Sequence, residues 1–164
     1  MRVLIGVISA MALVWPISAS ANWQYTTWGM TIEQVETASK NAASPTTPTV
    51  AQQQSPTDHS LTASLSAPYK SGAFSFTAYF MFDNAGKLAG LHLVLESGNP
   101  DALIGAVRIK YGKPVSEDND NNVLDSIDWY AAGDMIYIDK IGDGMNGQTS
   151  LDYKPRLNDD NKGL

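Results

Sequence analysis

The fold is decided by residues 74–114, which read FSFTAYFMFDNAGKLAGLHLVLESGNPDALIGAVRIKYGKP. In residues 74–82 every second side chain is Phe or Ala, and the residues between them are Ser, Thr, Tyr and Met. A period of two is typical of a strand with one buried face. Turn-forming residues follow at 83–87, where Gly86 is suited to a positive φ. The pattern therefore predicts a hairpin whose second strand covers residues 88–96. One face of this strand carries Leu91, Leu93 and Leu95, and the other carries Gly90, His92, Val94 and Glu96.

A helix is predicted directly after this hairpin. Asn99 is a favourable N-cap, Pro100 suits the first turn, and the carboxylate of Asp101 complements the positive end of the helix dipole. Apolar residues continue at helical spacing until Gly112 and Pro114, which are typical of a helix end.

The residues before this hairpin predict a second, shorter helix and one more strand. Residues 31–34 read TIEQ, which is a capping box that begins a helix running to about Ala42. The polar tract at about 41–60 contains several prolines and no periodicity, so we expect a flexible loop. Alternation in residues 61–67 predicts a strand that ends before Pro68.

The second half of the chain repeats this order. Residues 116–122 are expected to form an acidic turn, and strands are expected at 126–131, 135–138 and 149–153. The predicted fold class is α+β: a duplicated α-β-β-β unit forming an antiparallel sheet, with two helices packed on one face.

The N-terminus has the pattern of a Sec-type signal peptide. Arg2 precedes an apolar run from Val3 to Trp15, and a small-residue site predicts cleavage after Ala21. The apolar run is shorter than the roughly 20 residues that a membrane-spanning helix needs. We therefore expect a single domain at 22–155 with a polar tail at 156–164, located in the periplasm or outside the cell.

Composition restricts the chemistry of the chain. The absence of cysteine excludes a lipobox, disulfides, zinc–thiolate sites and cysteine nucleophiles. A formal charge of −6 argues against a nucleic-acid partner or an anionic lipid surface. We expect no cofactor, and no membrane span once the signal peptide is removed.

Two short motifs resemble known envelope proteins. Residues 28–35, with the pattern Trp-Gly-Met-Thr-x-x-Gln-Val, are similar to the helix start of the outer-membrane assembly lipoproteins of the SmpA/OmlA type. Residues 110–114, followed by a strand containing Trp129, are similar to part of many periplasmic domains of this shape. The element order also resembles that of β-lactamase-inhibitor proteins. The resemblance implies the fold and an envelope location. The assembly lipoproteins carry a lipobox cysteine and the inhibitors carry disulfides, so no functional residue is transferred to this chain.

A glycine pattern and an acidic pattern each suggest a ligand site. Residues 142–147 have the G-x-G-x-x-G spacing, but a dinucleotide site needs a helix at its end, so we interpret them as a hairpin loop. Asp118, Asp120 and Asn122 match the start of a calcium loop, although Val123 replaces its required glycine. A solvated acidic turn is the main interpretation, and a weak calcium site is the alternative.

The chain contains two histidines, His59 and His92. His59 lies in the polar tract, whereas His92 shares a strand face with Glu96, where a proton-transfer pair is possible. Neither a G-x-S-x-G elbow nor an H-E-x-x-H helix is present. We predict no catalytic residue and no metal site, and we interpret His92 as a partner-facing or half-buried residue.

The leading hypothesis is therefore a non-catalytic protein-binding module, adaptor-like or inhibitor-like, whose partner is another envelope or exported protein. The predicted binding residues are Tyr79, Met81, His92 and Val94, on an exposed sheet face. Trp23 and Trp28 are a further candidate ligand platform, with ordinary packing as the other interpretation. The alternatives are a small secreted hydrolase that uses His92 with an acid or serine not identified from the sequence, and a weak calcium-binding envelope protein.

Overall fold

A computed structural model describes residues 22–47, 60–120, 124–131, 133–142 and 147–156. The predicted signal peptide, His59, most of the polar tract and residues 157–164 of the predicted tail lie outside the described residues.

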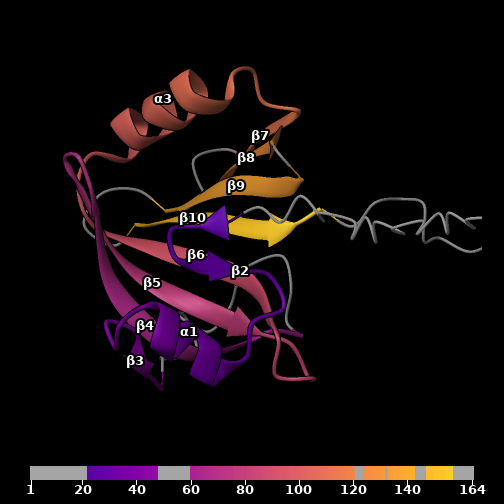
Figure 1. The fold of residues 1–164 in the computed structure, drawn as a ribbon. Coiled ribbons are helices and arrows are strands. Elements are labelled where there is room, and N and C mark those ends of the chain that lie inside the picture. The colour runs from indigo at the N-terminus through magenta and orange to yellow at the C-terminus, as the bar shows by residue number, and fades with distance from the viewer. Residues whose placement is uncertain (1–21, 48–59, 121–123, 132, 143–146, 157–164) are drawn as a thin grey trace, which may run out of the picture.

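The described residues form two helices and one large antiparallel sheet (Figure 1). The helices are α1 (Ile32–Ala38) and α3 (Pro100–Tyr111). The strands of the first half are β1 (Asn22–Trp23), β2 (Thr26–Thr27), β3 (Ser44–Pro45), β4 (Thr62–Ser71), β5 (Phe74–Phe82) and β6 (Leu88–Ser97). Those of the second half are β7 (Ser116–Asp120), β8 (Leu124–Ala131), β9 (Asp134–Ile141) and β10 (Gln148–Pro155). Eight strands pair in the order β3-β4-β5-β6-β10-β9-β8-β7, and β1 pairs with β2 in a separate small ribbon. The α+β class is confirmed, whereas the internal duplication stays a prediction.

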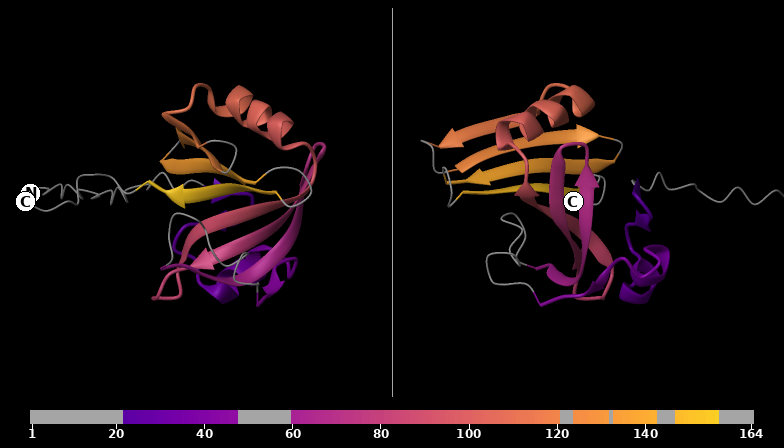
Figure 2. Two further views of the ribbon diagram at one scale, coloured as in Figure 1. Left: turned by 180° about the vertical axis from the view of Figure 1, so that it is seen from behind. Right: turned by 90° about the vertical axis from the view of Figure 1, so that its left-hand side faces the viewer.

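One side of the sheet, here called the apolar face, carries the main core. The alternation in β5 places Phe76, Ala78, Phe80 and Phe82 on this face, as predicted. Side chains from the other strands complete it: Leu65, Leu91, Leu93, Ile127, Trp129, Ile136, Ile138 and Leu151. Val35 of α1 and Leu103 and Val107 of α3 belong to the same cluster, so both helices pack on this one face. Figures 1 and 2 show α1 near the β3–β5 end of the sheet and α3 near the β7–β10 end.

Both helices begin where their capping residues predict. Thr31 and Gln34 form the complete capping box at α1. The side chain of Asn99 accepts a hydrogen bond from the backbone N–H of Ala102 at 2.9 Å. The prediction that the first helix runs to about Ala42 is wrong, because Lys40 and Asn41 adopt φ values of 55° and 64°, which end a right-handed helix.

The predicted end of the strand before Pro68 is also wrong, because β4 continues through Pro68 to Ser71. On its outer side β4 pairs only with the two residues of β3, Ser44 and Pro45, at Ser66 and Leu65. Beyond that point β4 is an edge strand among the described residues, and an edge strand tolerates proline. The strand β3 also shows that part of the predicted 41–60 loop is paired.

The acidic residues 116–120 form the edge strand β7 and not the predicted turn. Pairing with β8, for example Ser116 with Asp128, satisfies the backbone of this polar segment at the sheet edge. The glycine-rich stretch after β9 is confirmed as a hairpin connection, because β9 and β10 pair antiparallel from Ile141 and Gln148 onward. Residues 143–146 of that connection lie outside the described residues.

Candidate functional site

The side of the sheet opposite the core, here called the polar face, carries a row of polar and aromatic side chains. The strand registers align Tyr79 of β5, His92 of β6, Asp152 of β10, Tyr137 of β9 and Asp128 of β8 as direct neighbours. A parallel row on the same face contains Thr77, Val94, Ser150, Asp139 and Ser126. The two rows bring together residues separated by up to seventy-five positions in the sequence.

A buried histidine–aspartate pair lies at the centre of the polar face. His92 Nδ1 is 2.8 Å from Asp152 Oδ1, and both residues are only 1% exposed. His92 Nε2 and the second carboxylate oxygens of Asp152 and Asp139 are buried without a hydrogen-bond partner among the described residues. Burial raises the pKa of Asp139, while a hydrogen bond from Ser126 opposes this and the neighbouring Asp152 adds to it.

The predicted contact surface is wrong in one respect: it is not exposed. Tyr79, Met81, His92 and Val94 do share the polar face, but they are 5%, 1%, 1% and 8% exposed. The reason is a second, smaller core in which Tyr79, Met81 and Val94 pack with Ala63 and Leu61.

The structure pairs His92 with Asp152 instead of Glu96, whose carboxylate accepts a hydrogen bond from the Thr77 hydroxyl at 2.8 Å. Asp152 is thus an acid of the kind that the hydrolase alternative requires. A serine-type hydrolase also needs a side-chain nucleophile at the other ring nitrogen, and no described side chain bonds His92 Nε2. Among the described residues there is likewise no group of three His, Asp or Glu side chains that could hold a metal ion.

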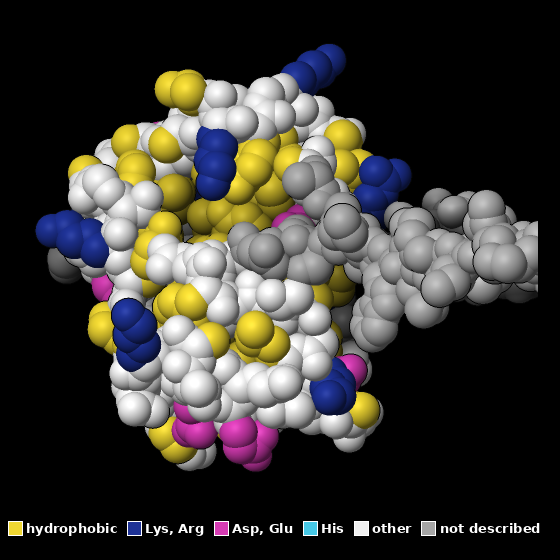
Figure 3. All heavy atoms as spheres, in the orientation of Figure 1, with side chains coloured by type: hydrophobic (Ala, Val, Ile, Leu, Met, Phe, Trp, Pro, Cys, Tyr) yellow, Lys and Arg dark blue, Asp and Glu magenta, His cyan; other side chains and the backbone are white. Residues whose placement is uncertain are grey.

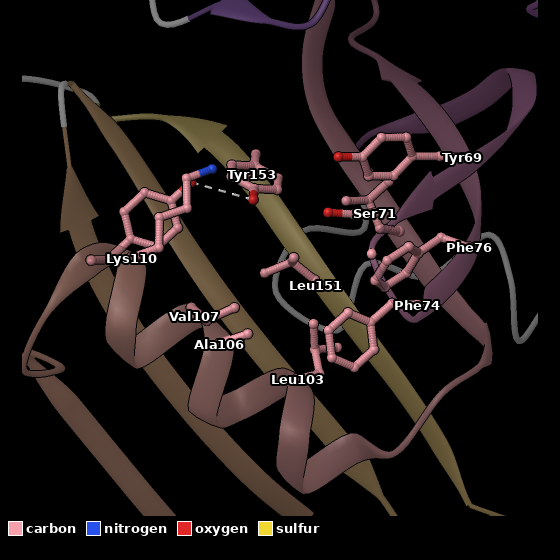
Figure 4. Close-up of a pocket in the computed structure, with 13 residues that line it drawn as sticks. Tyr69, Ser71, Phe74, Phe76, Leu103, Ala106, Val107, Lys110, Leu151 and Tyr153 are labelled. Atoms are coloured by element: carbon pink, nitrogen blue, oxygen red, sulfur yellow. Dashed lines mark hydrogen bonds between the residues drawn. The ribbon is translucent and has the colours of Figure 1, made fainter.

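A pocket opens on the apolar face between α3 and the end of the β4–β5 hairpin. Its volume is about 230 Å³. Figure 3 shows a hollowed apolar area below α3, and Figure 4 shows the side chains that surround the pocket. The lining residues are Tyr69, Ser71, Gly72, Phe74, Phe76, Leu93, Leu103, Ala106, Val107, Lys110, Tyr111, Leu151 and Tyr153.

Polar groups stand at two sides of this mostly apolar pocket. The hydroxyls of Tyr69 and Ser71 point into it from the β4 side (Figure 4). On the α3 side, the hydroxyls of Tyr111 and Tyr153 lie 3.4 Å apart. The ammonium of Lys110 lies 4.8 Å from the centre of the Tyr111 ring, a cation–π contact. The pocket therefore combines an apolar interior with a few polar groups at fixed positions.

The Tyr153 hydroxyl has an unusual environment. Burial raises the pKa of Tyr153, and the neighbouring Tyr111 hydroxyl raises it further. A tyrosine hydroxyl with its ordinary pKa of 10.0 is already protonated at neutral pH, so the Tyr153 oxygen carries a proton that it can donate. A perturbed titratable group in an apolar concavity is a common property of ligand sites.

Several contacts fix α3 as one wall of the pocket. Trp129 Nε1 donates a hydrogen bond at 3.0 Å to the carbonyl of Gly112, which ends the helix. Arg108 forms a salt bridge with Glu117 of β7. Lys140 Nζ of β9 lies 3.4 Å from Oδ1 of Asp101, which belongs to the first helical turn. Because these contacts involve both ends of the helix, the pocket is bounded by a positioned element rather than by a loop.

The two N-terminal tryptophans have packing partners. Trp23 packs edge-on against Tyr69 and Phe80, with ring centres 5.0 and 6.0 Å away. Trp28 Nε1 donates a hydrogen bond to Asp134 Oδ1 at 2.8 Å. Neither residue lines the pocket, so the suggested ligand platform stays a prediction without support from their positions.

Sequence reasoning did not identify the pocket. Its lining comes from β4, β5, β6, α3 and β10, and these meet only through the order of strands in the sheet. The one usable signal was in the predicted helix, whose apolar residues at helical spacing include the pocket residues Leu103 and Val107.

No protein-family model matches the sequence, and comparisons with curated proteins and with solved structures give no match. The suggested resemblances to assembly lipoproteins and β-lactamase inhibitors therefore stay predictions. Among the described helices, none has the length and apolar character required to cross a membrane.

Proposed function

We propose that this protein is a non-catalytic binding protein that holds a small, mostly apolar molecule in the pocket between α3 and the β4–β5 hairpin. The observation that carries the proposal is the pocket itself, a concavity of about 230 Å³ with apolar walls and a few convergent polar groups. Ligand sites in proteins usually have this composition.

Among the described residues no serine or other side-chain nucleophile bonds His92 Nε2, which supports binding over a serine-type hydrolase. The histidine–aspartate pair is buried to 1% exposure, whereas the pocket opens to the surface on the other side of the sheet. A substrate in the pocket would be separated from His92 by the sheet. The proposal retains the predicted export of the protein, which rests on the sequence of residues 1–21.

The test is a binding screen with residues 22–164, followed by amide chemical shifts in the presence of small apolar ligands. We expect the largest shifts at Leu103, Val107 and Leu151, which line the pocket. Ala106→Trp places an indole at the pocket wall and should abolish binding. Ile109→Trp is the matched control, because Ile109 lies on the same helix at 89% exposure and does not line the pocket.

Two results would contradict the proposal. One is that no small apolar compound binds. The other is that ligand-induced shifts persist in the Ala106→Trp variant. A protein from the envelope fraction whose capture is lost with Ile109→Trp but retained with Ala106→Trp would instead support the protein-binding module.

A duplicated α-β-β-β unit is part of the same proposal. It is supported by the order of the sheet, in which β4-β5-β6 after α1 and β8-β9-β10 after α3 meet through their last strands. Separate expression of residues 22–97 and 98–156 is the measurement. Reassembly of the two fragments into one folded complex is expected if each is a structural unit.

A further inference from the structure

The residues that line the pocket carry charge of one sign only. Among the thirteen described residues that line it, Lys110 carries a charge and none is acidic. An apolar cavity whose only ionic lining group is cationic favours ligands with an anionic end.

Lys110 is held at the pocket and has no ion pair with a described residue. Its ammonium lies over the Tyr111 ring at 4.8 Å from the centre, and the Tyr111 hydroxyl lies 3.4 Å from that of Tyr153. The two basic residues nearest to Lys110 in the sequence differ from it. Arg108 is paired with Glu117, and Lys113 lies beyond the helix end and outside the pocket lining.

The two tyrosine hydroxyls add a hydrogen-bond donor beside this cation. Within the pair only one O–H can point at the other oxygen, so the second O–H is available to an acceptor in the pocket. Tyrosine hydroxyls are protonated at neutral pH, so this donor is present when a ligand binds. A cation and a neutral phenol side by side match a carboxylate, which accepts several hydrogen bonds.

Size and wall chemistry restrict the apolar part of the ligand. An apolar protein cavity of about 150 Å³ binds benzene. The pocket, at about 230 Å³, therefore has room for one aromatic ring and a short arm. Phe74, Phe76 and Tyr69 supply aromatic faces and edges of the kind that pack favourably against another ring.

We infer that the pocket takes a small aromatic monocarboxylate, with its ring among Phe74, Phe76 and Leu103 and its carboxylate at Lys110 and the Tyr111–Tyr153 hydroxyl pair. This inference rests on the proposed function and narrows it to one ligand class.

The experiment compares three probes of nearly equal shape by titration calorimetry: 3-phenylpropionate, 3-phenylpropan-1-ol and 3-phenylpropylamine. We expect the acid to bind about threefold to tenfold more tightly than the alcohol, which is the range for one partly exposed charged hydrogen bond. We expect the amine to bind most weakly, and the advantage of the acid should shrink as salt is added.

Three variants locate the preference. Lys110→Met retains an unbranched apolar side chain as far as the ε position but removes the charged ammonium, so the acid and the alcohol should bind equally. Tyr153→Phe should reduce the preference in part. Lys113→Met removes a charge of the same sign outside the pocket lining, and we expect it to leave the preference unchanged.

The outcomes separate the two ideas. If the alcohol binds the wild type as tightly as the acid does, the ligand class is wrong while the pocket remains a binding site. If Lys113→Met removes the preference as fully as Lys110→Met does, general charge attraction accounts for it and the inference is overturned. If none of the probes binds the wild type, the inference is wrong, and the broader screen decides the proposed function.

Discussion

On the apolar face of the sheet, Trp129 and its neighbours pack against two helices. On the polar face, His92, Asp139 and Asp152 are buried as deeply as Trp129. Burial of the apolar face lowers the free energy of the folded chain, because apolar side chains are transferred from water into contact with one another. The polar face has three buried polar atoms without a partner among the described residues, and each such atom costs free energy.

The two faces differ in how strictly they specify the pairing register of β6 and β10. Many registers of β6 against β10 would bury leucines on the apolar face. Only the observed register sets Asp152 directly opposite His92. Because a slip by one residue moves every side chain to the other face, a buried pair of this kind penalises the wrong register. We therefore expect the apolar face to supply most of the stability and the polar face to select the register of β6 against β10.

The largest expected effect comes from the apolar face. Trp129→Ala removes a fully buried indole together with its hydrogen bond to Gly112. We expect a loss of about 3–5 kcal/mol in the free energy of unfolding, measured with urea. Tyr130→Ala, one position along on the other face and 45% exposed, is the control and should cost about 1 kcal/mol or less. Similar losses for both variants would remove the distinction between the faces.

The next effect tests the polar face through a double-mutant cycle. His92→Leu and Asp152→Leu should each lower the free energy of unfolding by about 3 kcal/mol. This value is the upper end for leaving a buried polar group unpaired and the lower end for breaking a buried ion pair. The double variant should cost clearly less than the sum, because neither partner is then left unpaired. Additive losses in urea unfolding would show that the pair at 2.8 Å has no energetic coupling.

A backbone substitution tests how closely the apolar face is packed at the junction before α3. Gly98 has φ 132°, and an added Cβ would lie 2.7 Å from Cδ1 of Phe74, a pocket residue. Gly98→Ala should therefore cost roughly 1–3 kcal/mol, as is usual for a strained backbone position. Gly105→Ala in α3 meets no atom within 4 Å and should instead stabilise the protein slightly. A neutral Gly98→Ala result would contradict the described geometry.

The smallest effect is a dependence on pH that arises from a buried carboxyl group of the polar face. Burial raises the pKa of Asp139, so the unfolded chain releases this proton at a lower pH than the folded chain does. Protonated Asp139 thus contributes to stability at low pH. This contribution is lost as the pH rises from 3.8, the ordinary pKa of an aspartate, through the raised pKa of Asp139 in the folded chain.

Asp139→Asn should accordingly be more stable than the wild type at pH 7, and this advantage should disappear on acidification below the ordinary aspartate range. Ser126→Ala is the companion variant, because it removes the hydrogen bond that lowers the pKa of Asp139 and should steepen the loss with pH. Chemical unfolding across this pH range measures both, and a constant difference between Asp139→Asn and wild type would refute the assignment.

Much of the local structure follows from short-range rules. The alternation in residues 74–82 and the caps at Thr31 and Asn99 predicted elements that the structure contains. These predictions succeeded because caps and pleats involve residues a few positions apart. The predictions that were wrong concern pairing at a distance, such as the acidic strand β7 and the continuation of β4 through Pro68.

The site was less predictable than the fold. His92 was identified, but its partner Asp152 lies sixty residues away and was not. Alternation correctly placed Tyr79, Met81 and Val94 on one face of the sheet. The prediction that this face is exposed was wrong, because burial depends on what packs above a strand. Alternation alone distinguishes two faces without telling which of them meets water.

The sequence by itself determined the class of fold, the two helix starts and the two faces of β5 and β6, because hydrophobic period and capping act within one element. Only the tertiary structure decided that β6 lies beside β10. That contact brings Asp152 to His92 on one face and completes the pocket with Leu151 and Tyr153 on the other. The physical reason is that strand order is set by the summed burial of the whole chain, a quantity that no single segment contains.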